Sequence, residues 1–280
     1  MRYRACMFYH IVFEIRGRIA WFTTPERLRA TARLLEEVLG PRLLLFGYVD
    51  EHGHAVIVAE DRADAGYIGS GLNRALQHLG ADVGPTHVTE VTDARHLANL
   101  IPYMARQPWK HPIVLDPADW DGACTQDLVG ARRGILDPMR IADALPRVDV
   151  AATALAAVGL RGPVCTASDA DILALGARAL WSAALAAFAA PSTGRLPATL
   201  AARGAYATIG RAVKLPLAEL RLAAGASKTG WRRMSHLVSP PEDQQAVRLQ
   251  LGFRALLAAN PIARRHIPTG TVQPVPRYER

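Results

Sequence analysis

The sequence predicts an α+β fold, in which a small antiparallel-sheet sandwich is followed by an all-α domain that contains a helix-turn-helix. Three observations lead to this prediction. Strand-like and helix-like segments alternate up to about Gln107, whereas only helical periodicity follows Ser168. Leu and Ala dominate a chain that is 50% hydrophobic but only 6% aromatic. This composition favours helices and is sufficient for a sizeable core.

The N-terminal part predicts seven elements in the order β-α-β-β-α-β-α, with the helices on one side of an antiparallel sheet. Thr24 and Pro25 are typical of a helix start, and Pro108 is typical of a helix end. The turn-like segment DEHG at 50–53 predicts a hairpin. The expected elements are a strand over 6–16, a helix over 25–39, hairpin strands over 42–50 and 53–60, a helix over 64–79, a strand over 86–92 and a helix over 93–107.

Beyond Pro108 the sequence predicts helices only. Residues 108–165 are rich in Pro, Gly and Asp, and they predict packed connecting helices near 123–132, 138–145 and 149–158. Ser168 and Ser239 are typical N-caps, and the spacing of Ser239 and Glu242 is typical of a capping box. The further helices are expected over 168–189, 197–213, 216–224, 227–237 and 241–259.

We divide the chain into four parts. These are a sheet-containing domain over 1–112, a helical connector over 113–165, an all-α domain over 166–262 and a flexible tail over 263–280. Residues 201–280 hold 13 Lys and Arg against 4 Asp and Glu, a net charge of +9, while the rest of the chain is close to neutral. A basic segment of this kind indicates a polyanionic partner, with a solubilising basic tail as the alternative.

Cysteine use and hydropathy exclude several classes of protein. Cys6, Cys124 and Cys165 are too few and too far apart for a disulfide framework or a cysteine zinc site. The sequence has neither a signal-peptide core nor an uncharged apolar run of about 18 residues. We therefore expect a soluble cytoplasmic protein without a membrane partner.

Two histidines one residue apart, His52 and His54, stand at the start of a predicted strand. Side chains at i and i+2 point to the same face of a strand, so the two imidazoles could hold a divalent metal. Tyr103 and Gln107 are four residues apart and share one face of the helix predicted over 93–107. A tyrosine phenol can attack a phosphodiester that a metal polarises, and Gln107 could supply an oxygen ligand. The alternatives are surface histidines and a half-buried core tyrosine.

Three motifs in this order resemble the single-tyrosine HUH transposases, especially the REP-associated tyrosine transposases. FYHIVFEIRGRIAWF resembles their opening strand, and EHGHAVIV resembles their histidine-rich strand. VTEVTDARHLANLIPYMARQPWKHPIV resembles their last strand and tyrosine helix, in which Tyr, three residues and then Asn or Gln precede Pro. The segment DWDGACTQDLVGARRGILDPMRIADAL resembles the helical extension that follows. The resemblance covers roughly residues 5–145.

The resemblance implies a ferredoxin-like HUH domain that nicks single-stranded DNA next to hairpins and transfers the strand. Tyr103 would form a 5′-phosphotyrosine link, and His52, His54 and Gln107 would hold Mg²⁺ or Mn²⁺. The sequence departs from the family pattern at Gly53, where the family has a bulky apolar residue. We expect this glycine to weaken the strand.

A second departure is Pro102, which lies inside the predicted tyrosine helix and should kink it. A third departure is the segment at 80–86, which is shorter than the corresponding segment of the family. The alternative reading is therefore a catalytically weak or inactive DNA-binding or regulatory protein. A helical protein-interaction module is a third class. We expect a monomer, with a dimer as the alternative.

Residues 216–237 have the character of a helix-turn-helix, with Gly225 at the turn and Ser227 as the cap of the second helix. Such a helix can enter the major groove of duplex DNA. The alternative is an ordinary helical bundle with a solvated basic face. Around the sheet-containing domain, further cations are candidates for phosphate contacts. The predicted DNA-binding residues are Arg16, Arg18, Arg74, Arg106, Lys110, Lys228, Thr229, Arg232 and Arg233.

Overall fold

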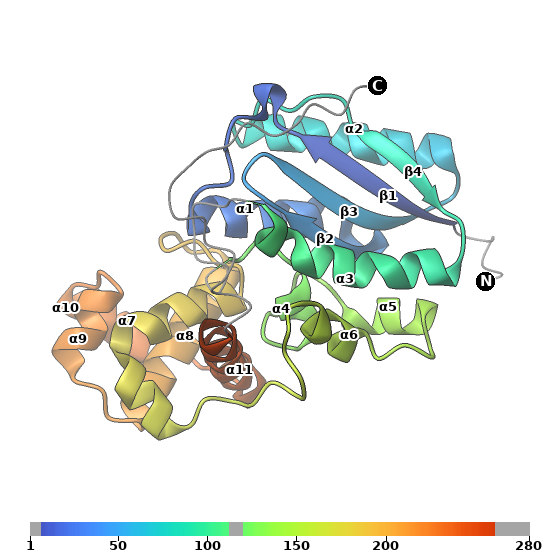
Figure 1. The fold of residues 1–280 in the computed structure, drawn as a ribbon. Coiled ribbons are helices and arrows are strands. Elements are labelled where there is room, and N and C mark those ends of the chain that lie inside the picture. Colours follow the sequence, from blue (N-terminus) through green and yellow to red (C-terminus); the bar gives the residue numbers. More distant parts are fainter. Residues whose placement is uncertain (1–6, 112–119, 261–280) are drawn as a thin grey trace, which may run out of the picture.

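The computed structural model describes residues 7–111 and 120–260, and the predicted tail over 263–280 lies outside the described residues. Four strands form one antiparallel sheet in the order β2-β3-β1-β4 (Figure 1). Their bounds are Met7–Glu14 for β1, Leu43–Tyr48 for β2, His52–Ala59 for β3 and His87–Val91 for β4. Helices dominate the rest of the chain. The predicted α+β class with a helical C-terminal part is confirmed.

Helices cover both faces of the sheet, so the expectation that they share one side was wrong. Helices α1 (Pro25–Leu39) and α2 (Arg62–His78) pack on one face, where the Tyr48 hydroxyl donates to the Leu28 carbonyl of α1. Helix α3 (Ala94–Lys110) packs on the opposite face, and Gly47 of β2 lets its backbone approach closely at Met104. The reason is that β3 is buried on both faces and needs apolar cover on each.

Helix α3 continues past Pro108, although the sequence predicted that it would end there, and it is continuous across Pro102 as well. A proline inside a helix removes one backbone hydrogen bond and clashes with the preceding turn. Here Pro108 and Gln107 are buried, and Trp109 packs against the same core. Tertiary burial of this last turn therefore overrides the local preference, and it keeps Tyr103 and Gln107 on one continuous helix.

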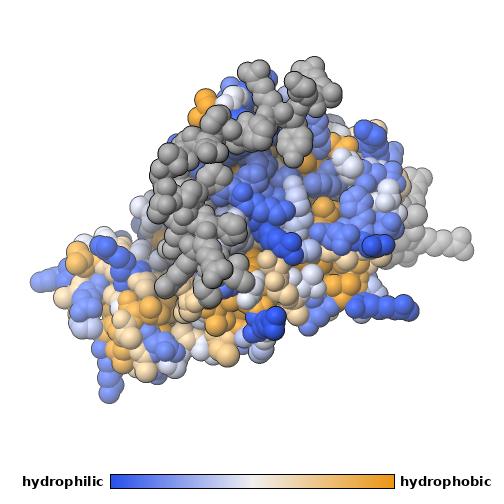
Figure 2. All heavy atoms as spheres, viewed as in Figure 1, coloured by the Kyte–Doolittle hydropathy of each residue, from blue (hydrophilic) through white to orange (hydrophobic). Residues whose placement is uncertain are grey.

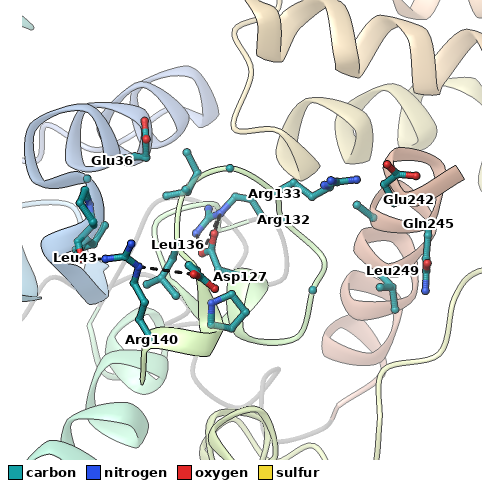
Figure 3. Close-up of a pocket in the computed structure, with 18 residues that line it drawn as sticks. Glu36, Leu43, Asp127, Arg132, Arg133, Leu136, Arg140, Glu242, Gln245 and Leu249 are labelled. Atoms are coloured by element: carbon teal, nitrogen blue, oxygen red, sulfur yellow. Dashed lines mark hydrogen bonds and ion pairs between the residues drawn. The ribbon is translucent and has the colours of Figure 1, made fainter. Parts of the chain in front are cut away.

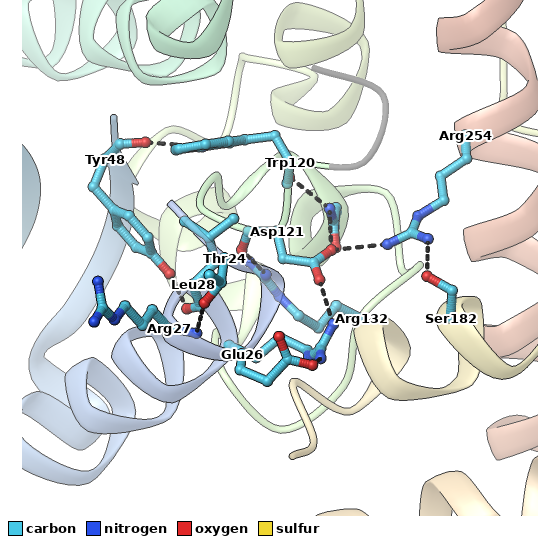
Figure 4. A network of polar contacts seen from close by, with 12 residues as sticks. Thr24, Glu26, Arg27, Leu28, Tyr48, Trp120, Asp121, Arg132, Ser182 and Arg254 are labelled. Carbon is cyan, nitrogen blue, oxygen red and sulfur yellow. Dashed lines mark hydrogen bonds and ion pairs between the residues drawn. The ribbon is translucent and has the colours of Figure 1, made fainter. Parts of the chain in front are cut away.

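The connector packs tightly between the sheet and the C-terminal helices. From residue 120 onward it contains three short helices, Thr125–Leu128 (α4), Pro138–Ala144 (α5) and Val150–Ala157 (α6). The Asp121 carboxylate is fully buried and accepts from Arg29 Nη1 of α1 at 3.1 Å and from Arg254 Nη2 at 3.0 Å (Figure 4). Trp120 Nε1 donates to the Tyr48 carbonyl at 2.9 Å. The connector is thus ordered by polar contacts to both sides, as expected for packed connecting helices.

The C-terminal helices form a second hydrophobic core around Trp181, Tyr206 and Trp231. Their bounds match the predicted ranges to within two residues. They are Asp169–Ala187 (α7), Pro197–Ala212 (α8), Leu217–Ala223 (α9), Lys228–Ser235 (α10) and Pro241–Ala259 (α11).

Two of the three serine caps predicted for the C-terminal helices are present. Ser168 forms a complete capping box with Asp171, and Ser227 accepts from the Gly230 amide at 3.0 Å. The capping box predicted for Ser239 is absent. Helix α11 begins at Pro241, as predicted, but with Pro240 as its N-cap, because a proline at the first helical position already has a helical φ. The Ser239 side chain therefore lies outside the helix.

Apolar residues gather on the surface of the C-terminal helices, on the face shown in Figure 2, while hydrophilic residues cover more of the sheet-containing part. Leu222 on α9 is 82% exposed, and Leu173 and Leu175 on α7 are about half exposed. Among the described residues, α7 is long and apolar enough to cross a membrane by length and composition, but half of that stretch is buried within the protein. This burial is typical of a core helix.

Candidate active site

Strand register brings histidines from two strands together on the face that α3 covers. His54 pairs with Val12 and His10 pairs with Val56, so the two imidazoles are diagonal neighbours. His10 Nε2 lies 3.1 Å from His54 Nδ1. The His52 ring is 5.1 Å from the His54 ring, as expected for side chains two residues apart on one strand. The two histidines predicted from the sequence therefore share a site with a third, His10.

Tyr103 of α3 faces this cluster. Its hydroxyl lies 3.3 Å from His54 Nε2, and its ring is 6.1 Å from the His10 ring. Gln107, one turn further along α3, is only 1% exposed, and its side chain lowers the pKa of Tyr103. Its Oε1 atom is buried and has no hydrogen-bond partner in the described part of the chain. All four predicted site residues thus converge on one place.

Gly53 fits its position by volume, while the expectation that it weakens the strand stays a prediction. A Cβ atom there would lie 2.5 Å from Phe13 Cε2 and 2.8 Å from Tyr48 Cβ. Phe13 is the residue opposite Gly53 on β1, and its ring fills the space that a bulky side chain would otherwise occupy. The aromatic residue on the neighbouring strand replaces the missing side chain, and β3 keeps both histidines on one face.

Burial sets the protonation of the cluster. Desolvation lowers the pKa of His10 and of His52 to about 4, and it lowers the pKa of His54 to about 2 with help from the charge of His10. Burial also raises the pKa of Tyr103, although the hydrogen bond from Gln107 acts in the opposite direction. At neutral pH the imidazoles are neutral and can donate a lone pair, whereas the phenol keeps its proton and needs a base.

The donor set of the site fits a divalent cation. Neutral imidazole nitrogens of His52 and His54 are good ligands for such ions, and the unpartnered Gln107 Oε1 would supply the oxygen that Mn²⁺ or Mg²⁺ prefers. Within residues 7–111 and 120–260, no group of three or more His, Cys, Asp or Glu side chains is arranged to hold a metal. The cation would therefore depend on the amide oxygen, on water and on a substrate phosphate.

Two residues of the site were missed by the sequence analysis. His10 lies in the first strand, and only the strand register shows that it shares a face with His54. His111 follows the end of α3, and its ring is 5.0 Å from that of His52. Burial lowers the pKa of His111 too. In the sequence, only its position just after the predicted tyrosine helix could have indicated that His111 belongs to the site.

The cations predicted to contact phosphates differ in how close they lie to the site. Lys110 Nζ lies over the Tyr103 ring at 5.2 Å, and the charge of Arg18 lowers the pKa of His52, so both cations are close to the site. Arg16 makes an exposed ion pair with Asp82 at 3.4 Å. Arg106 donates to the Ala157 carbonyl at 3.2 Å and faces α6. Arg74 lies on α2, across the sheet from the histidines, so it does not belong to the site.

Helix α10 presents the other predicted DNA-binding residues to solvent. Lys228, Thr229, Arg232 and Arg233 are exposed, while Trp231 and Met234 on the opposite side of the helix are buried. Trp231 contacts Tyr206 edge to face at a ring distance of 6.2 Å, so it is a packing residue. The turn before the helix places Gly225 at φ +59°, a conformation that glycine adopts without strain. The exposed side of α10 is basic and free of acidic residues.

A cavity of about 800 Å³ lies away from the histidine cluster, between α1, the connector and α11 (Figure 3). Its charged lining is largely paired, since Arg132 contacts Asp127 and Arg140 donates to the Pro41 carbonyl. None of the predicted site residues lines it. The chemistry indicated by the sequence belongs to the sheet face and not to this cavity.

No protein-family model matches the chain, and no curated protein matches it. A solved structure described as "Structure of the REP associates tyrosine transposase bound to a REP hairpin" is similar to this chain, with 18% identity and a TM-score of 0.35. The alignment covers 49% of this chain and 87% of the other. Values this low indicate a distant structural relation at most.

Proposed function

We propose that this protein is a metal-dependent enzyme that nicks single-stranded DNA at hairpin-associated sites and transfers the strand, with Tyr103 as the nucleophile. The observation that carries the proposal is the 3.3 Å contact between the Tyr103 hydroxyl and His54 Nε2, beside His52 and the buried amide of Gln107. An attacking oxygen and a set of cation ligands are together at one place. This combination is what phosphodiester cleavage by a protein side chain requires.

The proposed reaction exchanges one phosphoester for another. The Tyr103 oxygen forms a bond to the scissile phosphorus while the bond from phosphorus to the 3′-oxygen breaks. The phenolic proton passes through solvent to the departing 3′-oxygen, which leaves as a hydroxyl. Attack by another 3′-hydroxyl reverses these changes and releases the tyrosine. The ester bond is conserved in the 5′-phosphotyrosine, so strand transfer needs no nucleotide cofactor.

His52, His54 and Gln107 would hold the Mg²⁺ or Mn²⁺ ion. When bound, the ion supplies charge that stabilises the negative charge developing on the phosphate. Lys110 and Arg18 add positive charge at the edge of the site. A single-stranded backbone fits this arrangement because its phosphates can reach a partly recessed phenol, whereas duplex DNA is stiffer.

The test is the covalent adduct. Labelled single-stranded hairpin DNA is incubated with the protein and Mn²⁺ and separated on a denaturing gel. We expect a protein–DNA adduct that disappears in Tyr103→Phe and in the presence of a chelator. Tyr67→Phe is the matched control, because Tyr67 is 72% exposed on α2 and lies outside the site. Tight DNA binding without any adduct would reject the enzyme and favour a binding protein.

A second candidate function is duplex DNA binding by the C-terminal helices, either in addition to catalysis or in a catalytically weak or inactive regulatory protein. The exposed cations of α10 favour it, because Lys228, Arg232 and Arg233 have no ion-pair partner among the described residues. In contrast, several other arginines are paired with carboxylates. A row of unpaired cations on a capped helix suits contacts with phosphates and base edges.

Salt-dependent binding tests this second candidate. Replacing both Arg232 and Arg233 by alanine should weaken duplex binding and reduce the slope of log affinity against log salt by about 0.9 for each lost phosphate contact. Arg195→Ala, an exposed arginine outside α10, is the control. A slope that does not change would mean that α10 does not contact DNA. A chain without salt-dependent DNA affinity would instead be a protein-interaction module. We propose a cytoplasmic monomer, which sedimentation can check against a dimer.

A further inference from the structure

The contact between His10 and His54 has a consequence for the chemistry of the site. Both imidazoles are neutral at neutral pH, so each carries a hydrogen on only one ring nitrogen. At 3.1 Å between His10 Nε2 and His54 Nδ1, one of these two nitrogens must donate and the other must accept. The position of this hydrogen therefore also determines whether His54 Nε2, which faces Tyr103, carries a hydrogen or a lone pair.

Two arrangements are possible. If His10 donates, His54 carries its own hydrogen on Nε2. The hydrogen on Nε2 then points to the Tyr103 oxygen, and His54 has no lone pair on that side. If His54 donates through Nδ1 to His10 Nε2, its Nε2 carries the lone pair and Tyr103 donates to it. Only the second arrangement leaves His54 able to bind a cation on the side of Tyr103.

We propose that His10 is a positioning residue that holds His54 in the tautomer with hydrogen on Nδ1, so that the lone pair of Nε2 faces Tyr103. That lone pair can accept the proton of the phenol or bind a cation, one at a time. In either case His10 acts through His54 and does not touch the reacting atoms. The second ring nitrogen of a ligating histidine is commonly fixed in this way by a neighbouring acceptor. The choice of this tautomer rests on the proposed function, because cation binding by His54 requires that lone pair.

The variants His10→Gln and His10→Leu separate positioning from packing. The glutamine amide oxygen can accept from His54 Nδ1 at about the place of the imidazole nitrogen, whereas leucine fills the space without an acceptor. His78→Leu is the control, because His78 is exposed at the end of α2, on the other side of the sheet. Circular dichroism and thermal melting identify any variant that fails to fold. If His10→Leu fails to fold, His10→Gln still tests the proposal.

The first measurement is the tautomer of His54, read from long-range ¹H–¹⁵N spectra of the metal-free full-length protein at neutral pH. We expect the Nδ1–H form in the wild type, in His10→Gln and in His78→Leu, and a shift toward the Nε2–H form in His10→Leu. The second measurement is Mn²⁺ affinity by calorimetry, which should fall by about 10- to 100-fold in His10→Leu. In His10→Gln the affinity should stay near that of the wild type.

Three results would overturn the proposal. They are a wild-type His54 in the Nε2–H form, a His10→Leu variant with unchanged tautomer and unchanged Mn²⁺ affinity, and a His10→Gln variant that loses as much affinity as His10→Leu. If the wild type forms no DNA adduct, the proposed function fails, but the tautomer and Mn²⁺ measurements still decide the role of His10.

Discussion

The fit between Gly53 and Phe13 gives the sharpest test of how the site is built. In Gly53→Ala, the new Cβ atom would lie 2.5 Å from Phe13 Cε2 and 2.8 Å from Tyr48 Cβ, so at least one of the two rings must move. Neither ring can move freely. Phe13 packs edge to face on Phe22 at 6.3 Å, and Tyr48 lies 5.0 Å from the same ring. The substitution therefore strains a closed aromatic cluster.

The magnitude follows from the closeness of these contacts. Overpacking a well-packed core by one carbon costs about 1–3 kcal/mol, and we expect the upper half of this range because both neighbours are fully buried. Phe13→Ala alone should cost about 3–5 kcal/mol through the cavity that it leaves. In the double variant the clash with the Phe13 ring is gone, and only the contact with Tyr48 Cβ at 2.8 Å remains. The cost of the double variant should then be at least about 1 kcal/mol below the sum of the two single changes.

Urea denaturation followed by circular dichroism measures these free energies of unfolding. Gly66→Ala is the matched control, because a Cβ atom at Gly66 of α2 meets nothing within 4 Å. There the substitution should stabilise the helix by up to about 1 kcal/mol. A loss below about 0.5 kcal/mol in Gly53→Ala, or strict additivity in the double variant, would refute the idea that Phe13 replaces the missing side chain.

Three further predictions concern stability. Because the pKa values of His10 and His52 are lowered to about 4, the folded protein favours neutral imidazoles, and stability should be full above pH 6.5 and fall by about 3 kcal/mol for each histidine as the pH drops to 4. An equal urea midpoint at pH 7.5 and pH 5 would contradict this. Asp121→Ala removes the carboxylate that Arg29 and Arg254 share and should cost about 3–5 kcal/mol by chemical denaturation; a cost under about 1 kcal/mol would mean that the network is not stabilising. Ser168→Ala should cost about 1 kcal/mol of unfolding free energy through loss of its capping box, whereas Ser239→Ala, outside any cap, should be close to neutral, and equal effects would be inconsistent with these assignments.

Local signals predicted most elements well. Thr24 and Pro25 mark the start of α1, and Ser168 marks the start of α7, because capping and proline geometry depend only on neighbouring residues. The same rules failed at Pro108 and Ser239. At Pro108 burial of the last turn of α3 outweighs the lost hydrogen bond, and at Ser239 the following prolines set the helix start. Local preference was overridden where tertiary contacts or a stronger neighbouring signal competed with it.

Some contacts of the candidate site could be predicted from local spacing, and others could not. Spacing within one strand and within one helix placed His52 beside His54 and Tyr103 beside Gln107, because periods of 2 and 3.6 residues are properties of the backbone. Spacing alone could not place His10 next to His54, since that contact depends on the register between β1 and β3. It also could not place α3 on the opposite side of the sheet from α1 and α2.

The sequence by itself determined which side chains can carry the chemistry and which local elements present them. Only the tertiary structure decided that the tyrosine helix faces the histidine strand, that His10 completes the contact and that the ring of Phe13 occupies the space at Gly53. The physical reason is that strand register and the choice of sheet face are fixed by burial summed over distant segments, which no short stretch of sequence contains.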